Sequence, residues 1–159
     1  TPILQAALLA SPMAISAIIG AFFTDDANEI LRNETILLLR GLAEGNAEIQ
    51  KMAVFEGVFD HTFQVVDKVL QEEEGDEDGS RIGTSIVLQD CLELLGILVA
   101  GNSSNQLMFR ESGFLSKTLA TVKKIIQPSK GKSKVLQASA ERSVSLALGI
   151  VVLLTKPPS

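Results

Sequence analysis

The segments GNAEIQKMAVFEGVF (residues 45–59) and GNSSNQLMFRESGFL (residues 101–115) repeat one pattern at a distance of 56 residues. Each begins with Gly-Asn, has Gln at the sixth position and Met at the eighth, and reaches a second Gly at the thirteenth. A shift of 56 aligns residues 30–70 with 86–126 without a gap, and eleven of the 41 pairs are identical. Ordinary amino-acid usage would give about three identities. The chain therefore contains an internal repeat.

Each copy predicts three helices, which in the first copy cover residues 29–45, 47–57 and 58–70. Gly45 ends the long first helix, because glycine readily takes the left-handed conformation that follows a helix. Asn46 can then accept a hydrogen bond as the N-cap of the short second helix, which ends at Gly57. In the third helix, apolar residues recur at the spacing of one buried face.

The period of 56 contains an insertion at residues 71–84, QEEEGDEDGSRIGT, which is charged, rich in glycine and predicts a loop. Without these 14 residues the period is 42, within the roughly 40–47 of HEAT and armadillo repeats. The order of short helix, apolar helix, loop and long apolar helix is that of armadillo repeats. We therefore expect an all-α fold, an armadillo-type α-solenoid of about three stacked three-helix repeats.

We expect a single armadillo-like domain over residues 1–159. Its parts are a partial repeat at 1–44, a repeat at about 45–100 with an acidic loop at 71–84, and a repeat at about 101–154 with a basic loop at 127–134. Solenoid ends need polar capping repeats, and both ends of this sequence are apolar instead. The sequence is therefore expected to be a fragment of a longer solenoid.

The composition argues against several functions. The net charge of −5 argues against nucleic-acid binding, for which a stripe of basic residues is typical. Cys91 is the only cysteine and His61 the only histidine, and Cys91 lies in an apolar helical pattern typical of a buried thiol. The sequence has no GxSxG motif, phosphate-binding glycine loop or metal-ligand cluster. We expect no enzymatic activity, no cofactor and no metal.

The first 24 residues carry no charge, which raises the question of a membrane span. Gln5, Ser11 and Pro12 interrupt this stretch, and no basic residue flanks it. The segment ASPMA at residues 10–14 is typical of one helix that stops and a second that starts. We interpret the stretch as two solenoid helices.

The long helices of an armadillo stack line a concave groove, and their outward side chains can bind a partner. Helical geometry gives the candidates Asn33, Arg40, Gln89, Glu93 and Arg142. Importin-type armadillo proteins place Trp and Asn in this groove to bind basic peptides. The equivalent positions here hold Leu37, Gly41, Glu93 and Ile97, and the chain has no Trp. The groove therefore does not fit nuclear localisation signals.

The two charged loops should emerge on the same edge of the solenoid, since they occupy equivalent places in successive repeats. The acids are Glu72, Glu73, Glu74, Asp76, Glu77 and Asp78. The lysines are Lys123, Lys124, Lys130, Lys132 and Lys134. One interpretation is two mobile loops that increase solubility. The other is an edge that docks a charged partner or a membrane surface, with these lysines as candidate binding residues.

The segments SPMAISAII, LRNETILLL, IVLQDCLELL and NSSNQLMFRESG, with the closing KPPS, resemble the globular head of the general vesicular transport factor family. That family tethers vesicles in traffic from the endoplasmic reticulum to the Golgi. The resemblance implies an armadillo head in a cytoplasmic protein that is a homodimer with a long coiled-coil tail. It also implies peripheral association with Golgi and ER–Golgi membranes.

The same resemblance implies protein partners: a Rab GTPase of the early secretory pathway, golgins and SNAREs. It carries no motif that assigns a partner to a particular residue here. The function expected is a non-enzymatic interaction scaffold in vesicle tethering. The alternative is an armadillo-type cofactor that binds the nucleotide-binding domain of Hsp70 and promotes nucleotide exchange.

Overall fold

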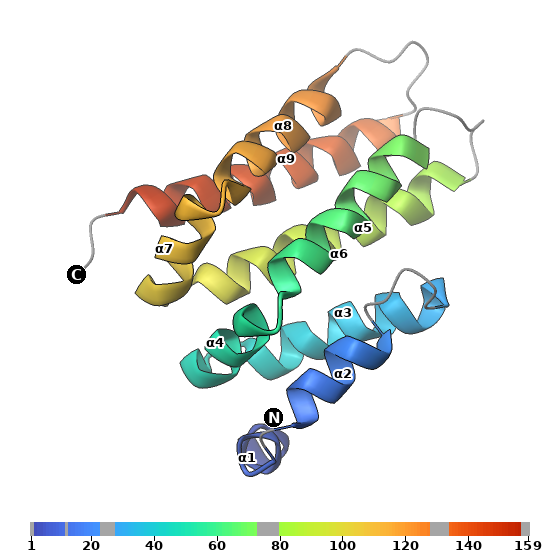
Figure 1. Cartoon of the computed structure of the whole chain (residues 1–159). Coiled ribbons are helices and arrows are strands. Elements are labelled where there is room, and N and C mark those ends of the chain that lie inside the picture. Colours follow the sequence, from blue (N-terminus) through green and yellow to red (C-terminus); the bar gives the residue numbers. More distant parts are fainter. Residues whose placement is uncertain (1, 12, 23–27, 73–79, 128–133, 157–159) are drawn as a thin grey trace.

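The computed structural model describes residues 2–11, 13–22, 28–72, 80–127 and 134–156. Within these ranges the chain forms nine helices and no strand (Figure 1). They are α1 (Pro2–Leu9), α2 (Ala14–Phe22), α3 (Glu29–Ala43), α4 (Ala47–Phe55), α5 (Val58–Glu72), α6 (Ser80–Val99), α7 (Ser103–Glu111), α8 (Phe114–Ile126) and α9 (Lys134–Thr155). The all-α class predicted from the sequence is confirmed.

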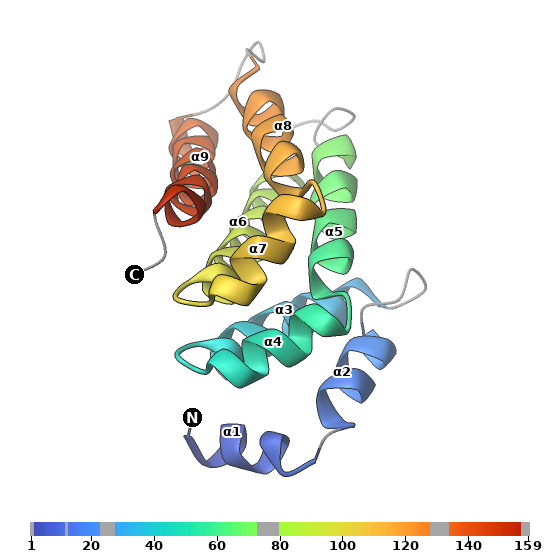
Figure 2. The ribbon, with the colours of Figure 1, turned by 60° about the vertical axis from the view of Figure 1, so that its left-hand side comes forward.

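The helices stack in layers, each made of one short helix followed by two further helices. The long helices α3, α6 and α9 run in the same direction (Figure 1), and α6 packs against both of the others. The short helices α4 and α7 lie one above the other in successive layers (Figure 2). This is the armadillo-type solenoid that the repeat predicts.

The corners between helices follow from the repeated Gly-Asn pair. Gly45 and Gly101 have positive φ angles of 68° and 65°, which a residue with a Cβ adopts only under strain. The Asn46 side chain accepts a hydrogen bond from the backbone N–H of Ile49 at 3.1 Å, as the N-cap of α4. Asn102 caps α7 in the same way. The cap predicted at Asn46 is confirmed, and the second copy of the repeat makes the equivalent cap.

The glutamine of the repeated phrase joins each short helix to the long helix before it. Gln50 donates from Nε2 to the Ala43 carbonyl at 3.0 Å, and Gln106 donates to the Val99 carbonyl at 2.9 Å. Both carbonyls belong to the last turn of a helix, where no intrahelical donor is left for them. The repetition of the glutamines is visible in the sequence, but their role becomes visible only in the fold.

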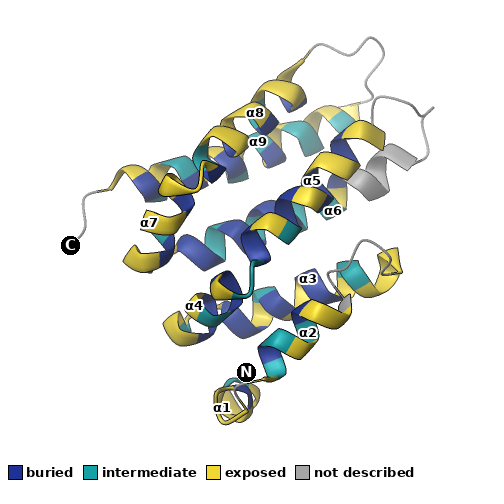
Figure 3. Cartoon of the chain, in the orientation of Figure 1, coloured by how far each residue is buried: buried dark blue, intermediate teal, exposed yellow. Residues whose placement is uncertain are grey.

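The core is continuous through the stack and densest at α5 and α6 (Figure 3). Its aromatic part joins two layers, since Phe59 and Phe63 of α5 meet Phe109 of α7 and Phe114 of α8. The Phe59 and Phe109 rings lie 5.0 Å apart edge to face, a favoured geometry for aromatic pairs. Cys91 is fully buried, and burial raises the pKa of its thiol to about 12.

The predicted acidic loop is shorter than the sequence suggested. Residues 71–72 still belong to α5, and α6 begins at Ser80, so that 80–84 are helical. A glycine such as Gly83 destabilises a helix by only about 1 kcal/mol relative to alanine, which is too little to end the helix. Residues 73–79 lie outside the described residues, and so do all of the predicted acids except Glu72.

The predicted basic loop at 127–134 differs from the helix bounds by one residue, because α8 ends at Ile126 and Lys134 is helical. Lys123 and Lys124 lie in the last turn of α8, and Lys134 is the first residue of α9. Lys130 and Lys132 lie outside the described residues. The ends of α5 and α8 and the starts of α6 and α9 all lie at one end of the molecule (Figure 1).

Among the described helices, α9 is long and apolar enough to cross a membrane, judged by length and composition alone. Helices α1 and α2 are long and apolar enough only if this bent pair is counted as one span. The structure buries part of the apolar content of α9, while Val135, Leu148 and Val152 stay exposed. Ala147, Ile150 and Leu154 are buried in the core. Arg142 carries a charge in the middle of the helix and forms an ion pair with α6. We interpret α9 as a packing helix.

Candidate interaction surface on the groove helices

A groove with a volume of about 810 Å³ lies along the C-terminal halves of α3, α6 and α9. Buried Leu92 and Ile150 form part of its floor, and Ile97, Leu146 and Leu153 add further apolar surface. Its charged lining residues are Arg40, Glu44 and Glu93. The groove therefore combines an apolar floor with a small number of charged groups, as protein-binding surfaces do.

Each of the three helices places a glycine in this groove: Gly41, Gly96 and Gly149. A Cβ added to Gly41 or Gly149 would meet no atom within 4 Å. At Gly96 it would make an ordinary contact of 3.9 Å with the Ile150 side chain. Glycine inside a helix costs about 0.5–1 kcal/mol relative to alanine. Packing within the chain therefore does not require these glycines, and they leave helix backbone uncovered in the groove.

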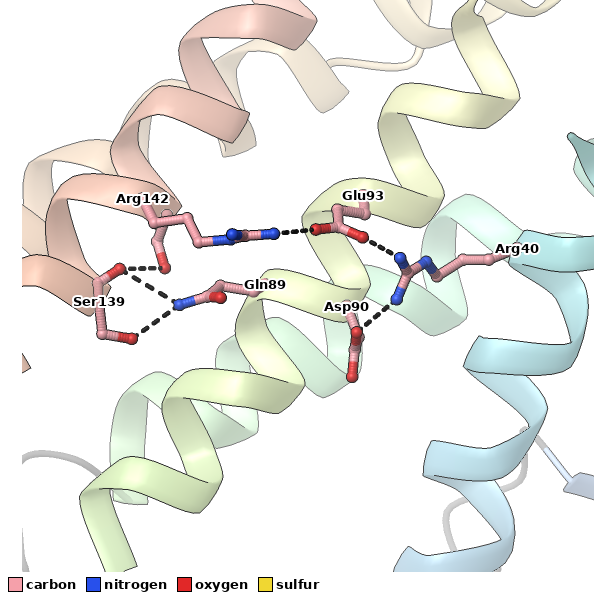
Figure 4. A network of polar contacts seen from close by, with 7 residues as sticks. Arg40, Gln89, Asp90, Glu93, Ser139 and Arg142 are labelled. Carbon is pink, nitrogen blue, oxygen red and sulfur yellow. Dashed lines mark hydrogen bonds and ion pairs between the residues drawn. The ribbon is translucent and has the colours of Figure 1, made fainter.

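A chain of ion pairs crosses the three helices beside the groove (Figure 4). Arg40 of α3 donates from its two terminal nitrogens to Asp90 and Glu93 of α6. Arg142 of α9 donates to the other carboxylate oxygen of Glu93 at 3.0 Å. Glu93 thus lies between two arginines that come from the layers on either side of it. The chain of contacts joins three consecutive layers.

A second polar link between α6 and α9 lies next to the ion pairs (Figure 4). Gln89 donates from Nε2 to the hydroxyl of Ser139 at 2.7 Å. The hydroxyl of Ser85 also lies within hydrogen-bond distance of the Ser139 hydroxyl. The contact between α6 and α9 is therefore polar toward the start of α9 and apolar toward its end.

The Arg40, Asp90 and Glu93 side chains are only partly exposed, at 25%, 23% and 21%, whereas the Arg142 side chain is exposed. Desolvation raises the pKa of the Asp90 carboxyl, and the charge of Arg40 opposes that shift. Two arginines face two carboxylates, so their formal charges cancel. The network leaves the groove without a surplus of positive charge.

The structure brings four of the ten candidate residues together: Arg40, Gln89, Glu93 and Arg142 (Figure 4). They were expected to point outward toward a partner, and the structure pairs them with one another and with Ser139 and Asp90 instead. Asn33 lies two turns before Arg40 on α3 and accepts a hydrogen bond at 3.4 Å from Arg32. It takes no part in the network. Binding of a partner by any of these residues stays a prediction.

Three of the lysine candidates lie among the described residues, and none of these three lines the groove. Lys123, Lys124 and Lys134 are exposed, at the end of α8 and the start of α9. Asp90 was not among the predicted residues, although it lies three residues before Glu93 and so on the same helix face. Within the described part of the chain, no group of three or more His, Cys, Asp or Glu residues could hold a metal ion.

Comparisons with known proteins give relatives of much greater length. The chain is 35% identical over 116 residues to human general vesicular transport factor p115, which covers 73% of this chain and 11% of the relative. It is 32% identical over 155 residues to the intracellular protein transport protein USO1 of Saccharomyces cerevisiae, covering 96% of this chain and 8% of the relative. It is 40% identical over 90 residues to golgin candidate 6 of Arabidopsis thaliana, covering 57% and 8%.

Solved structures agree with these sequence matches. Crystal structures of Uso1-1 and Uso1-2 resemble this chain with TM-scores of 0.77 and 0.76, at 30% and 32% identity. Each covers 98% of this chain, which spans 22% and 21% of those chains. The chain spans about a tenth of the length of the human relative. No family model matches the chain.

Proposed function

Because this chain belongs to the family of the vesicular transport factors p115 and Uso1, we propose that it is an interaction scaffold in vesicle tethering. The names of its relatives describe transport factors. The observation that carries the proposal is the groove of about 810 Å³ along α3, α6 and α9. Its apolar floor is open to solvent, and the ion pairs of Arg40, Glu93 and Arg142 hold its walls together.

The scaffold would act without chemistry of its own. Packed helices and inter-layer hydrogen bonds keep the stack rigid, so that a partner meets a surface that is already formed and loses less entropy of ordering. We propose that the partners are a Rab GTPase of the early secretory pathway, a golgin or a SNARE. In the longer protein, a homodimer would present two such surfaces. Its place would be the cytoplasmic side of Golgi and ER–Golgi transport membranes, bound peripherally.

The exposed lysines at the α8–α9 end offer a second contact in this proposal. Lys123, Lys124 and Lys134 are positioned to attract an acidic partner or an anionic membrane surface. Exposed ion pairs contribute less than about 1 kcal/mol each to stability, so the fold does not depend on them. We propose that they raise the rate of association with a partner that also contacts the helices.

Binding of the chain to an early-secretory Rab GTPase tests the proposal. The GTPase is loaded with a GTP analogue or with GDP, and the nucleotide-binding domain of Hsp70 is the comparison. Binding that prefers the GTP analogue supports a tether whose recruitment surface includes these repeats. Binding to Hsp70 alone supports the chaperone cofactor and contradicts the tether.

A further inference from the structure

The groove along α3, α6 and α9 does not suit an extended peptide. An extended segment leaves its backbone N–H and C=O groups unpaired, and each needs a partner when it is buried. The polar residues that line the groove are Arg40, Glu44, Glu93 and Ser145, with no Asn or Gln among them. Arg40 and Glu93 already bind each other. A bound helix satisfies its own backbone and needs no such donors.

The glycines allow a helix to come close. Gly41 and Gly149 present bare backbone with no atom within 4 Å of the Cβ position, and Gly96 lies on the helix between them. Adjacent helix axes lie about 8–10 Å apart, so three helices span about 20 Å. At 1.5 Å per residue, a helix of about 13 residues covers that width.

The charges at the groove favour a basic ligand. The Arg40 and Arg142 charges are neutralised by Asp90 and Glu93. Glu44 also lines the groove and has no cation of the described residues within ion-pair distance. It directly follows the C-terminus of α3, where the helix dipole adds partial negative charge. The C-terminus of α6 reaches the same groove at Ala100.

From these contacts we infer that the groove binds one amphipathic helix of a protein partner, with its apolar face over the three glycines and a lysine or arginine against Glu44. This inference rests on the proposed scaffold function and names the class of partner for that surface. It is the helix-in-groove mode of recognition, in which apolar anchors recur every three or four residues.

A displayed library of single helices, randomised on one face and held by a fixed helical scaffold, tests the inference on the full chain. We expect the selected helices to carry apolar residues and at least one Lys or Arg. Gly149→Leu should lower the affinity of the chain for these helices by about tenfold or more, equivalent to about 1.4 kcal/mol. The matched control is Gly20→Leu on α2, because Gly20 also has no atom within 4 Å of its Cβ position and lies outside the groove.

A charge exchange supplies the second readout. Glu44→Lys should lower the affinity for the same helices by about tenfold. A selection that uses this variant as its target should return helices with Asp or Glu instead. The inference is overturned if no helix is enriched, if the enriched helices bind the Gly149→Leu variant as tightly as the unchanged chain, or if basic residues are not selected. Rab binding is measured separately. If no helix binds the groove but the Rab GTPase still binds the chain, only the inference is rejected. Helix binding without Rab binding rejects only the proposed Rab partner.

Discussion

The side chain of Asn102 donates a hydrogen bond to the side chain of Gln50 at 3.1 Å, in the buried space between two successive layers. Asn102 caps α7 in its own layer, and Gln50 of α4, in the layer before, binds the end of α3. The two residues are therefore the point where the repeated phrase of one layer meets that of the next. Asn46 makes the same cap on α4 without an inter-layer side-chain bond of this kind among the described residues.

Replacing Asn102 with alanine should destabilise the chain more than replacing Asn46. Loss of an N-cap costs about 1 kcal/mol, and Asn102→Ala also leaves the buried amide oxygen of Gln50 without its donor, at a further cost of about 1–2 kcal/mol. We expect about 2–3 kcal/mol for Asn102→Ala and about 1 kcal/mol for Asn46→Ala, measured by urea unfolding. Equal costs for the two variants would show that the inter-layer bond adds nothing.

The groove glycines and the corner glycines should respond to alanine in opposite directions. Gly41→Ala and Gly149→Ala should stabilise the chain by about 0.5–1 kcal/mol each, because the Cβ meets no atom and alanine favours helix. Gly45→Ala should destabilise it by about 1 kcal/mol or more, because its φ of 68° strains a residue with a Cβ. Thermal unfolding of the three variants measures both signs. Destabilisation by Gly41→Ala would mean that Gly41 fills a packing role.

The ion-pair chain should contribute modestly to stability. Glu93→Gln removes the carboxylate shared by Arg40 and Arg142, and we expect a loss of about 1–2 kcal/mol because both partners are left partly buried or unpaired. The control is Glu48→Gln, which breaks the exposed pair with Lys51 and should cost less than about 0.5 kcal/mol. Urea unfolding at low and high salt checks the difference. If the two losses are the same, the ion-pair chain does not stabilise the fold.

Asp90 should make stability fall as pH rises through acidic values. Burial raises its pKa in the folded state, so the folded chain binds the proton more tightly than the unfolded chain does. Its ionisation therefore removes stability between the ordinary value near pH 4 and the raised folded value, and the loss is complete above that value. The stability of the unchanged chain relative to Asp90→Asn should decline across this window. A flat or rising difference would contradict the direction of the shift.

Cys91 should be unreactive until the chain unfolds. Its thiol is fully buried and its pKa is raised to about 12, so almost no thiolate is present at neutral or mildly alkaline pH. We expect no reaction with Ellman's reagent in native buffer and one thiol per chain in denaturant. Rapid labelling of the native chain would show that α6 opens locally.

The features that the sequence predicted well are those that depend on neighbours along the chain. Gly45 and Gly57 turn the backbone, Asn46 caps the next helix, and the apolar spacing of residues 58–70 sets the buried face of α5. Each depends on a few consecutive residues whose chemistry is independent of the rest of the fold. The resemblance to vesicular transport factors likewise followed from contiguous segments.

The arrangement of the groove depends on residues far apart in the sequence. Arg40 and Glu93 are 53 residues apart, and their contact depends on how one layer is rotated against the next. Helical geometry placed Arg40, Glu93 and Arg142 on outward faces but could not show that these faces turn toward one another. The open space at Gly41 and Gly149 also depends on the spacing of three helices. A local pattern carries no information on such distances.

The position of Glu93 between two arginines has a mechanical consequence. In a repeat solenoid each layer contacts only its neighbours. Here a displacement of either outer layer pulls on the same carboxylate in the middle layer, because Arg40 and Arg142 hold its two oxygens. Force applied along the stack is thus shared by three layers, and a displacement at the α3–α6 contact also acts on the α6–α9 contact. Strain would then pass from one end of this segment to the other.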